Sequence, residues 1–595
     1  MDLVEELFTS ATSLVETAYC DQSFGINAFI GRVPTEAQVE IFLGQCGLYD
    51  NTRRRWIHMP WAPVQDTEVR YPVFNILQAI LKHFGYTKTR DVFAPIDSKS
   101  LLLNYSAWLT IPSICALITE AEGAFHSVVD PAHNLSSGDV YPICASPIMV
   151  KTYGNANQAK DIVQLGIFAA CSCFSMQSNR SAVYSLRITE QDVMLYLFDR
   201  SGTTFFSSFN IHENPLDFVR LILGVVSPDD SLIGFDTSVF WKGKQRFIRS
   251  LDDDGRYVCY PLISLEPFYK VIMIRSCGTI CWKATDPITG MELVIKDTWV
   301  SELCMEVNLL KASKGLAGVS QIENSGDDCN RYTGPRFSDL NAGKPITEFE
   351  SAQEFLCALR DAISGHRNLW KRAILHRDVH PGNIVIGRGK TEGTRGVLID
   401  LSHAKRLNQS KSQSLFVRAA VGSHAFLSVN NLECYETGGA SSPHNHLDDL
   451  ESFFYVFCSI VFRFTGPKTV IRSPALLANW FNLHNSVALN SKKWMYFNDS
   501  VDELISPFFG PVFQALFRNL LDFFRSKVRD RRMKTEEGFF RVISQVKADS
   551  EEDYQKVLSL FDEAIYELAR TPRSSKRLRA NNSVEREGST TKKRR

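Results

Sequence analysis

The sequence lacks any uninterrupted hydrophobic run long enough to cross a membrane. The nearest candidate, residues 101–118, is broken by five polar or proline residues: Asn104, Ser106, Thr110, Pro112 and Ser113. A membrane-spanning helix needs about 20 consecutive, mainly apolar residues. We therefore expect no contact with a membrane.

An excess of charge of either sign is also lacking. Lys and Arg together number 66, and Asp and Glu together number 66. Proteins that coat nucleic acid or a membrane surface usually carry a clear excess of positive charge. The balance argues against both classes for the chain as a whole, and we expect no specific nucleic acid among its partners.

Paired cysteines and a signal peptide are missing as well. The 14 cysteines are scattered singly apart from Cys171 and Cys173, which have no second pair at the spacing of a zinc finger. Residues 1–6 are acidic, whereas a signal peptide begins with positive charge. We expect a soluble, reduced, intracellular protein with buried or free thiols.

The residues that are present suffice for several folded units. A chain of 595 residues, 44% of them hydrophobic, is too long for one domain. Changes of pattern predict five parts: a helix and linker over residues 1–35, a mixed α/β domain over residues 36–255, an α+β domain over residues 256–545, a C-terminal helix over residues 546–569 and a disordered basic tail over residues 570–595. A regulatory role is the default expectation for the first domain.

Local patterns predict the elements of both domains. Helical apolar spacing occurs over residues 37–47, 73–84, 158–177 and 216–225. Strands are predicted over residues 182–186, 193–198 and 203–211, with a hairpin turn at 199–202. In the second domain we expect strands over residues 271–274, 280–283 and 293–296 and a helix over residues 303–310, followed after residue 350 mostly by helices.

One segment of the second domain carries the chemistry. It reads LHRDVHPGNIVI over residues 375–386 and, after a short loop, VLID over residues 397–400. The acid Asp378 is thus followed five residues later by the amide Asn383, and a second acid, Asp400, ends the next strand. The full pattern is far more specific than any one of its parts.

These residue types fit the transfer of a phosphoryl group from a magnesium nucleotide. A hydroxyl nucleophile needs a carboxylate close by, which orients it and accepts its proton. Magnesium prefers hard oxygen ligands, and Asn383 and Asp400 supply them. Asp378 is the acid left without a metal role, so we assign it as the catalytic base. The sequence therefore predicts ATP and Mg²⁺ as cofactors.

A lysine upstream completes the candidate nucleotide site. Lys296 ends a predicted strand, where a lysine contacts the α and β phosphates and pairs with a glutamate on a helix. We choose Glu306 as that glutamate, with Glu302 as the alternative. Taken alone, Lys296 fits a solvated edge lysine better, and its assignment depends on the residues downstream.

Together these residues resemble the eukaryotic protein kinases, and more closely the fungal-type protein kinase family. Further segments carry the resemblance: GHR at 365–367, GSHAFLS at 422–428, HLDDLESFFYV at 446–456, and the residues 177–180, 199–202 and 233–236 of the amino-terminal half. Residues 422–428 are similar to the end of an activation segment. Residues 446–456 are similar to the buried helix that carries a structural aspartate, here Asp449.

The resemblance implies a fold, a reaction and roles for single residues. The fold is α+β, a bilobal protein-kinase-like domain with a small β-rich lobe and a large helical lobe, preceded by a separate mixed α/β domain. The reaction is that of an ATP-dependent serine/threonine protein kinase, which transfers the γ-phosphate to Ser or Thr hydroxyls of a protein substrate. By the same resemblance, Asp449 braces the catalytic loop, and Arg377 is similar to the arginine through which kinases sense a phosphorylated activation segment.

Several positions depart from the usual kinase pattern. Gly278 is the single glycine where a glycine-rich phosphate loop is expected. We place Gly278 at the nucleotide, and we expect the backbone of this loop to approach the phosphates less freely than a glycine-rich loop does. His380 stands where most kinases have lysine, and we expect it to contact phosphate, more weakly when neutral. Leu401 and Ser402 replace Phe and Gly, and Asn430 falls near the position of a structural glutamate.

Two alternatives stay open. The departures are compatible with a pseudokinase scaffold that binds nucleotide or partners without turnover. The run HPGN at 380–383 is also similar to small-molecule kinases of the aminoglycoside and choline type. We favour a protein substrate, because residues 422–428 and the helix with Asp449 resemble a peptide-binding segment that small-molecule kinases lack.

Basic clusters near the C-terminus predict nuclear import. Arg573, Lys576, Arg577 and Arg579 precede a polar spacer and the run KKRR at 592–595. Two basic clusters with a polar spacer are typical of a nuclear-import signal. We therefore expect a nuclear-import receptor as a partner, with the nucleus favoured over the cytoplasm as the location.

Overall fold

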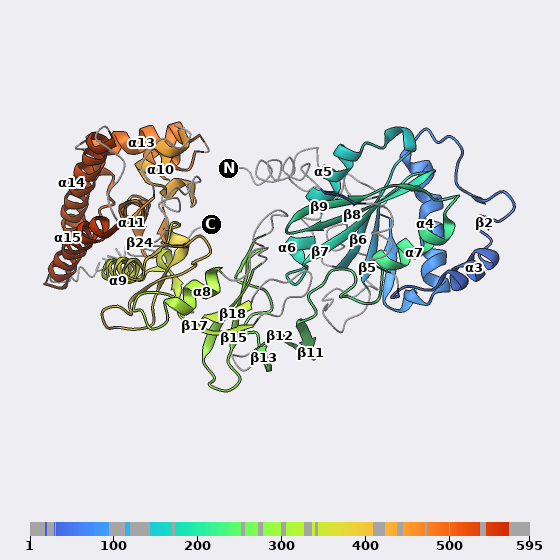
Figure 1. Ribbon diagram of the computed structural model, residues 1–595, viewed down its shortest axis with the longest axis horizontal. Coiled ribbons are helices and arrows are strands. Elements are labelled where there is room, and N and C mark those ends of the chain that lie inside the picture. Colours follow the sequence, from blue (N-terminus) through green and yellow to red (C-terminus); the bar gives the residue numbers. More distant parts are fainter. Residues whose placement is uncertain are drawn as a thin grey trace, which may run out of the picture. The chain divides into compact units, whose positions relative to one another are not determined.

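The computed structural model describes most of the chain as a mixture of helices and strands (Figure 1). The described residues are 18–20, 29, 31–94, 113–118, 143–168, 173–251, 256–271, 278–298, 305–326, 336–339, 343–407, 423–436, 444–470, 473–482, 484–498, 500–535 and 543–570. The chain divides into two compact units, Met1–Gly315 with Ser320–Ala342, and Leu316–Val319 with Gly343–Arg595. The two units are considered separately.

The first unit contains an eight-stranded sheet with the order β1-β9-β8-β7-β6-β5-β4, in which β10 also pairs with β8. Its strands are β1 (Ala18–Cys20), β4 (Arg90–Phe93), β5 (Ile114–Ile118), β6 (Cys144–Val150), β7 (Ala182–Ile188), β8 (Asp192–Asp199), β9 (Gly202–Phe206) and β10 (Phe209–Asn210). β6 and β7 run parallel, and every residue in them is buried. Such continuous burial is typical of central strands that are covered on both faces.

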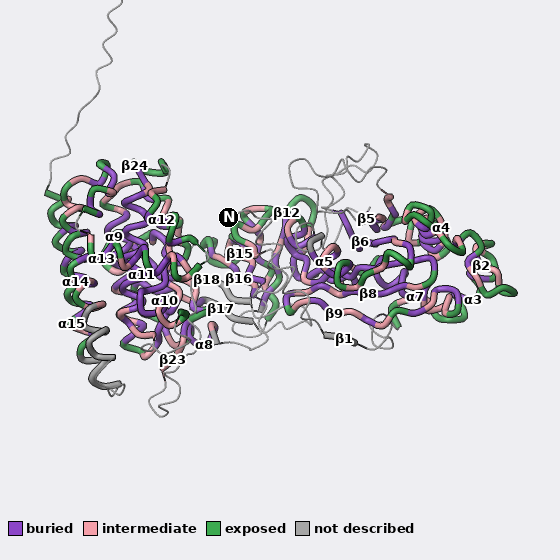
Figure 2. The backbone as a smooth tube through the Cα atoms, turned by 90° about the horizontal axis from the view of Figure 1, so that it is seen from above, coloured by how far each residue is buried: buried purple, intermediate pink, exposed green. Residues whose placement is uncertain are grey.

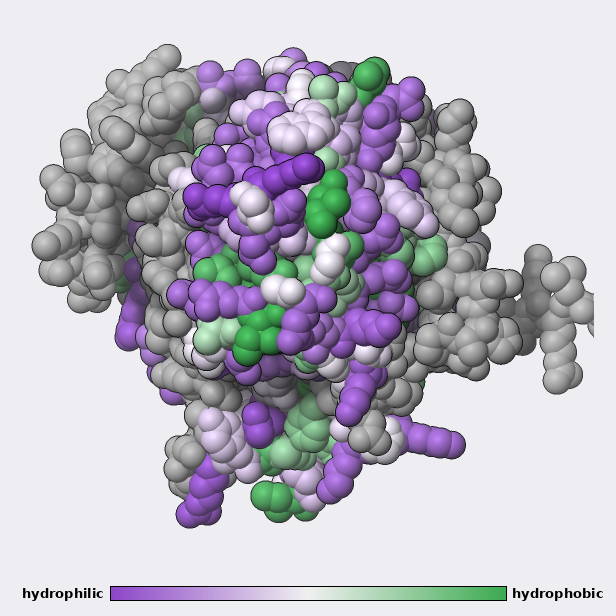
Figure 3. Space-filling view, turned by 90° about the vertical axis from the view of Figure 1, so that its right-hand side faces the viewer, coloured by the Kyte–Doolittle hydropathy of each residue, from purple (hydrophilic) through white to green (hydrophobic). Residues whose placement is uncertain are grey.

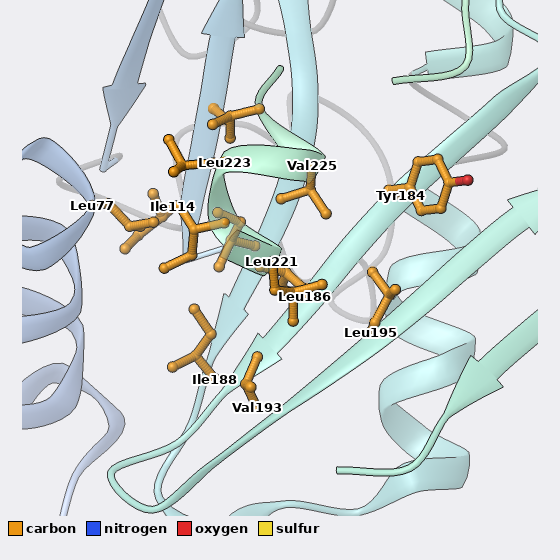
Figure 4. Close-up of a cluster of buried hydrophobic side chains, with 14 of the residues drawn as sticks. Leu77, Ile114, Tyr184, Leu186, Ile188, Val193, Leu195, Leu221, Leu223 and Val225 are labelled. Atoms are coloured by element: carbon orange, nitrogen blue, oxygen red, sulfur yellow. The ribbon is translucent and has the colours of Figure 1, made fainter. Parts of the chain in front are cut away.

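Helices and short strands complete this part of the first unit. They are α3 (Glu36–Gln45), β2 (Tyr49–Asp50), β3 (Arg55–Trp56), α4 (Asp66–His83), η1 (Tyr86–Lys88), η3 (Tyr153–Asn155), α5 (Gln158–Phe168), α6 (Phe174–Met176) and α7 (Pro215–Val225). Figure 4 shows Leu77 of α4 and Leu221 of α7 beside Ile114 and Leu186 of the sheet, all of them buried. Each leucine buried in this way contributes roughly 1.5–3 kcal/mol to folding.

The predicted hairpin at residues 199–202 is confirmed, with one difference in the strand that follows it. Asp199 pairs with Gly202 across the turn, and the Ser201 N–H donates to Asp199 Oδ1 over 2.8 Å. The strand predicted over residues 203–211 is wrong as a single element. It ends at Phe206, and β10 returns to pair with the beginning of β8.

The helix predictions in this unit are confirmed in part. Helices α3 and α7 lie at the segments predicted at 37–47 and 216–225, although α3 ends at Gln45, and α4 begins at Asp66, earlier than the predicted residue 73. Helix α5 covers Gln158–Phe168, and after Cys173 in helical conformation the short α6 covers Phe174–Met176. Residues 169–172 lie outside the described part, so the single helix over residues 158–177 stays a prediction.

Two smaller sheets of the first unit share one core. β11 (Val239–Lys242), β12 (Gln245–Leu251) and β13 (Tyr257–Pro261) form the first sheet, and β14 (Tyr269–Lys270), β15 (Ile280–Thr285), β16 (Glu292–Asp297), β18 (Arg336–Asp339) and β17 (Ile322–Gly326) form the second, in this order. Ile248 and Tyr260 of the first sheet pack with Trp282 and Ile295 of the second. α8 (Met305–Ala312) packs against β17.

The turn between β15 and β16 follows the predicted chemistry. Asp286 Oδ1 accepts the N–H groups of Ile288 and Thr289 over 2.6 and 2.8 Å, and Gly290 has a φ of 72°. An aspartate that bonds the backbone two residues ahead and a glycine at positive φ are typical turn residues. The strand predicted over residues 271–274 lies almost wholly outside the described residues.

The predicted boundary at residues 250–255 falls between β12 and β13, which pair with each other. The two compact units divide elsewhere, near residues 315 and 343. The predicted order of domains stays a prediction, as does the bilobal arrangement.

The second unit is mainly helical. Its elements are β19 (Lys344–Pro345), η5 (Ile346–Glu348), α9 (Ala352–Lys371), β20 (Ile374–Leu375), η6 (Pro381–Asn383), β21 (Ile384–Ile386), β22 (Gly396–Leu398), β23 (Lys405–Arg406), η8 (His424–Phe426), α10 (Val429–Glu436), α11 (His446–Val461), β24 (Phe464–Gly466), β25 (Thr469–Val470), α12 (Ala475–Trp480), α13 (Asn485–Phe497), η9 (Val501–Leu504), α14 (Gly510–Thr535) and α15 (Ile543–Arg570). Figure 2 shows α11 buried along its length, as the resemblance implies for the helix that carries Asp449.

A close backbone contact joins α9 to the strand that leads to Asp400. A Cβ added to Gly365 would lie 2.0 Å from the Gly318 carbonyl oxygen, so only glycine fits at that point of α9. The same Gly318 oxygen accepts the Leu398 N–H over 2.9 Å. The glycine of the GHR segment thus allows the backbone of residues 316–319 to lie between α9 and β22.

Figure 3 shows a face of the protein on which hydrophilic side chains predominate and hydrophobic ones form small groups. None of the helices within the described residues combines the length and the apolar character that a membrane span requires. The basic tail predicted to direct nuclear import lies outside the described residues.

Candidate active site

In the first unit, Lys296 and Glu306 form a buried ion pair. Lys296 lies on β16 with 7% of its surface exposed, and Glu306 lies in the first turn of α8. Lys296 Nζ is 2.8 Å from Glu306 Oε1 and 3.1 Å from Oε2. The chosen partner is therefore the one that contacts the lysine. Glu302, the alternative, lies outside the described residues.

Gly278 precedes β15 in a conformation that suits glycine. Its φ is 55°, and a Cβ added there would lie 2.8 Å from Cγ of Arg200. The Arg200 guanidinium in turn lies 4.3 Å from the centre of the Phe174 ring. Close approach to Arg200 is thus a structural reason for this glycine, and its predicted place at the nucleotide stays a prediction.

In the second unit, the loop between β20 and β21 brings Asp378 and Asn383 together. Asn383 Nδ2 donates to the Asp378 carbonyl oxygen over 2.9 Å and lies 3.4 Å from Asp378 Oδ2. The Asn383 carbonyl accepts the Ile399 N–H over 2.9 Å, and Asp400 follows directly. The predicted base and the two predicted metal ligands therefore belong to one hydrogen-bonded loop and the segment after β22, which ends at Leu398 and not, as predicted, at Asp400.

His376 holds the two sides of this loop together. Its Nδ1 accepts the Asp378 N–H over 3.3 Å, which leaves Nε2 as the donor to the Ile399 carbonyl over 3.0 Å. Complete burial lowers the pKa of His376, although the Asp449 carboxylate opposes that shift. The ring is thus a neutral link between the catalytic loop and the segment that leads from β22 to Asp400.

Two residues of this site have left-handed backbone conformations. The φ of Arg377 is 72° and that of Asp400 is 66°. Such a conformation costs a non-glycine residue about 1–3 kcal/mol and persists only where the surrounding structure holds it. Asp400 is held in part by the Ser402 N–H, which donates to its Oδ1 over 3.1 Å. The residue that replaces the usual glycine after Asp400 therefore contacts that aspartate directly.

His380 lies beside the predicted base. Its Nδ1 accepts the Gly382 N–H over 3.1 Å, and its Nε2 is 3.7 Å from Asp378 Oδ2. Burial lowers the pKa of His380, while the negative charges of Asp378 and Asp400 oppose the shift. A neutral His380 can donate from Nε2 toward the base. Its predicted contact with phosphate stays a prediction.

Ser423 contributes a contact that the sequence did not reveal. Its backbone N–H donates to Asp378 Oδ1 over 2.8 Å. The residue belongs to the GSHAFLS segment, which resembles the end of an activation segment, but nothing in the composition of that segment identifies a backbone donor. One oxygen of the predicted base is therefore engaged by this segment, and the other faces Asn383 and His380.

The Asp449 carboxylate, on α11, contacts the backbone of the catalytic loop. Its Oδ2 accepts the Arg377 N–H over 3.0 Å and is 2.8 Å from His366 Nε2, while its Oδ1 is 2.7 Å from His444 Nε2. Burial favours the neutral acid, but His444 and His366 outweigh it and hold the pKa of Asp449 well below its usual value. The bracing contact expected of Asp449 is present, whereas the two histidines were not foreseen.

Buried polar groups anchor the segment that contains Asn430. Asn430 Nδ2 donates to Asp448 Oδ1 over 3.2 Å, and the same oxygen accepts the Ser428 hydroxyl over 2.6 Å. The Val429 N–H donates to Glu451 Oε1 over 3.0 Å. Asparagine at position 430 thus removes the usual carboxylate, but two acids of α11 hold this segment by hydrogen bonds.

Lys492, on α13, also contacts the segment that contains Asn430. It is fully buried, its Nζ donates to the Leu427 carbonyl over 2.5 Å, and Nζ lies 4.0 Å from the centre of the Tyr455 ring. Burial lowers the pKa of Lys492 to about 7, against the opposing effects of Glu451 and Cys458. A lysine with this pKa changes its charge near neutral pH.

Lys492→Met is expected to alter the pH dependence of stability. Between pH 7 and the ordinary lysine pKa of 10.5, the unfolded chain binds the proton and the folded chain does not, so the parent gains stability as pH rises. The limiting slope is about 1.4 kcal/mol per pH unit. Urea unfolding at pH 7 and pH 8.5 measures it. The parent should gain more stability than Lys492→Met, and equal gains would contradict the lowered pKa.

Comparison with known families agrees with these features. The family model described as fungal protein kinase matches residues 140–328 and 338–461, which is just over half of the chain. The match begins just before β6 of the eight-stranded sheet and ends at the last residue of α11, so it includes Lys296, Asp378 and Asp449. A search of curated proteins finds no match. The chain belongs to the fungal protein kinase family.

Proposed function

We propose that this protein is a serine/threonine protein kinase that transfers the γ-phosphate of ATP to hydroxyl groups of a protein substrate. The observation that carries the proposal is the loop in which Asn383 bonds both the backbone and the side chain of Asp378 while its own carbonyl accepts the N–H of Ile399, the residue before Asp400. Asp378, Asn383 and Asp400 are the residue types, in the order, that kinases use.

The donor set fits a magnesium ion. Asn383 uses its amide nitrogen on Asp378, so its amide oxygen is directed away from that contact, and Asp400 contributes a carboxylate. Magnesium prefers such oxygen ligands and, when bound, neutralises the charge that develops on the phosphates. We assign Asn383 and Asp400 to hold it. Asp378 then orients the substrate hydroxyl and accepts its proton.

The buried pair in the first unit supports the same reaction. A lysine held by a glutamate on a neighbouring helix is the arrangement that kinases use to bind the α and β phosphates. Glu306 contacts Lys296 through both carboxylate oxygens, so the ammonium group has a defined position. We propose that Lys296 binds ATP and that Glu306 positions it.

The test is transfer of labelled γ-phosphate from ATP to a generic protein substrate. Transfer should require magnesium, and chelation by EDTA should reduce it to background. Lys296→Met should lower kcat/KM for ATP by about 10²-fold, the usual cost of losing one preorganised charge-stabilising group. Lys283→Met on the adjacent strand β15 is the matched control, because Lys283 is exposed.

The outcome also separates the alternatives. Binding of magnesium ATP, seen as a thermal shift, without transfer to any substrate would favour a pseudokinase scaffold. Transfer to low-mass alcohols but not to proteins would favour a small-molecule kinase. Transfer that is unaffected by EDTA and by Lys296→Met would contradict the proposed site.

A further inference from the structure

The C-terminal helix α15 lies beyond the matched family residues yet packs along α9. The family match ends at residue 461, and α15 covers Ile543–Arg570. Polar contacts join the two helices, among them Arg360 to Asp562 over 2.7 Å and Trp370 Nε1 to Ser550 Oγ over 2.7 Å. Figure 1 shows α15 beside α14 in the second unit. A helix outside the family match is thus tied to the core of this unit.

One contact of α15 differs from the others because it leads toward the active site. Tyr554 is completely buried, and its hydroxyl is 2.6 Å from His366 Nδ1 on α9. The opposite ring nitrogen of His366, Nε2, is 2.8 Å from Asp449 Oδ2. His366 therefore stands between the C-terminal helix and the aspartate that binds the catalytic loop.

The direction of these hydrogen bonds follows from the chemistry of each group. An ionised carboxylate only accepts, so His366 Nε2 carries a proton and donates it to Asp449. The Tyr554 hydroxyl donates to Nδ1 of a neutral ring and accepts from Nδ1 of a charged ring, so this hydrogen bond is present in either state. Burial raises the pKa of Tyr554 well above its usual value, which keeps the hydroxyl protonated.

The carboxylate oxygen that accepts from His366 also accepts from the catalytic loop. Asp449 Oδ2 receives the Arg377 N–H over 3.0 Å, and Arg377 directly precedes the predicted base Asp378. The hydrogen bond with His366 thus orients Asp449 Oδ2. The same oxygen in turn positions the backbone of the catalytic loop through the Arg377 N–H. Tyr554 fixes the ring that orients it.

We propose that Tyr554 is a positioning residue for the catalytic loop, acting through His366 and Asp449, and that α15 is for this reason part of the kinase machinery. A phenylalanine would fill the same apolar space, whereas a buried hydroxyl costs free energy unless it is hydrogen-bonded. The hydroxyl is therefore explained by its bond to His366. The effect on turnover rests on the proposed function, but the effect on the loop does not.

Tyr554→Phe tests the proposal, because it removes the hydroxyl and keeps the ring. Ser550→Ala is the matched control: it removes a buried hydrogen bond between the same two helices, to Trp370, which does not lead to Asp449. The first measurement is hydrogen exchange of the Arg377 amide in the full-length protein. The second is kcat and KM for ATP in the labelling assay.

We expect the Arg377 amide of Tyr554→Phe to exchange about 5-fold faster, and kcat to fall about 5-fold with KM for ATP unchanged, which corresponds to one hydrogen bond of ~1 kcal/mol. Ser550→Ala should leave both unchanged. Equal exchange in parent and Tyr554→Phe, equal effects of the two variants, or faster exchange with an unaltered kcat would overturn the proposal. If the parent shows no transfer, the proposed function fails, and the exchange result alone decides whether Tyr554 positions the loop.

Discussion

Asp378→Asn is expected to lower kcat for phosphate transfer by about 10²–10⁴-fold, the range that general acid–base catalysis contributes. The amide retains the shape of the side chain and an oxygen that can accept the Ser423 N–H. The bond from Asn383 to the backbone carbonyl of residue 378 is also retained. What is lost is the ability to accept the proton of the substrate hydroxyl. The fold and the affinity for ATP should therefore change little.

The measurement is steady-state transfer of labelled phosphate, with the melting temperature as the test of folding. Asp502→Asn serves as the control: it makes the same chemical change in the second unit, at an aspartate of η9 that pairs with Arg518 over 2.7 Å. The control should retain its kcat. If Asp378→Asn transfers phosphate as well as the parent, the assignment of the base is wrong.

Asp449→Ala is expected to reduce the free energy of unfolding by about 3–5 kcal/mol, the usual cost of removing one partner of a buried charged network. The substitution leaves the Arg377 N–H, His366 and His444 without their shared acceptor in a site where Asp449 is only 1% exposed. Urea unfolding at neutral pH measures the loss. A reduction of less than 1 kcal/mol would show that the network contributes little to stability.

Asp449→Asn separates the charge from the shape. The folded-state pKa of Asp449 lies well below its ordinary value of 3.8, so this group stabilises the folded state above that value. The contribution is lost as pH falls below 3.8 toward the folded-state pKa. Parent and Asp449→Asn should therefore differ most near neutral pH and converge in acid. A constant difference at all pH values would contradict the lowered pKa.

Local sequence patterns predicted the elements that depend on neighbouring residues. The turn at 286–290 needed an aspartate that bonds the backbone ahead of it and a glycine at positive φ, and both are visible in the sequence. The division of residues 203–211 into two strands was not visible, because β10 depends on pairing with the beginning of β8. The apolar composition of a segment does not predict the residue at which its pairing with a neighbouring strand ends.

The candidate site shows the same division between local and distant information. The spacing of Asp378, Asn383 and Asp400 follows from residue types in their order along the chain, and the same order left Glu306 and Glu302 as candidate partners of Lys296. His444 and Tyr554 carry no such signal. His444 contacts Asp449 from just before α11, and Tyr554 contacts His366 only because α15 packs against α9.

By itself, then, the sequence determined the chemistry that we propose for this protein: a candidate base, two candidate oxygen ligands and a lysine with a candidate glutamate, in the order of a kinase. The tertiary structure alone decided what holds that chemistry in place, from the backbone contact at Gly365 to the histidines around Asp449. The physical reason is that catalytic groups must be of particular types, which a motif records. The groups that support them need only a suitable donor at the right distance, which many residues can supply from any part of the chain.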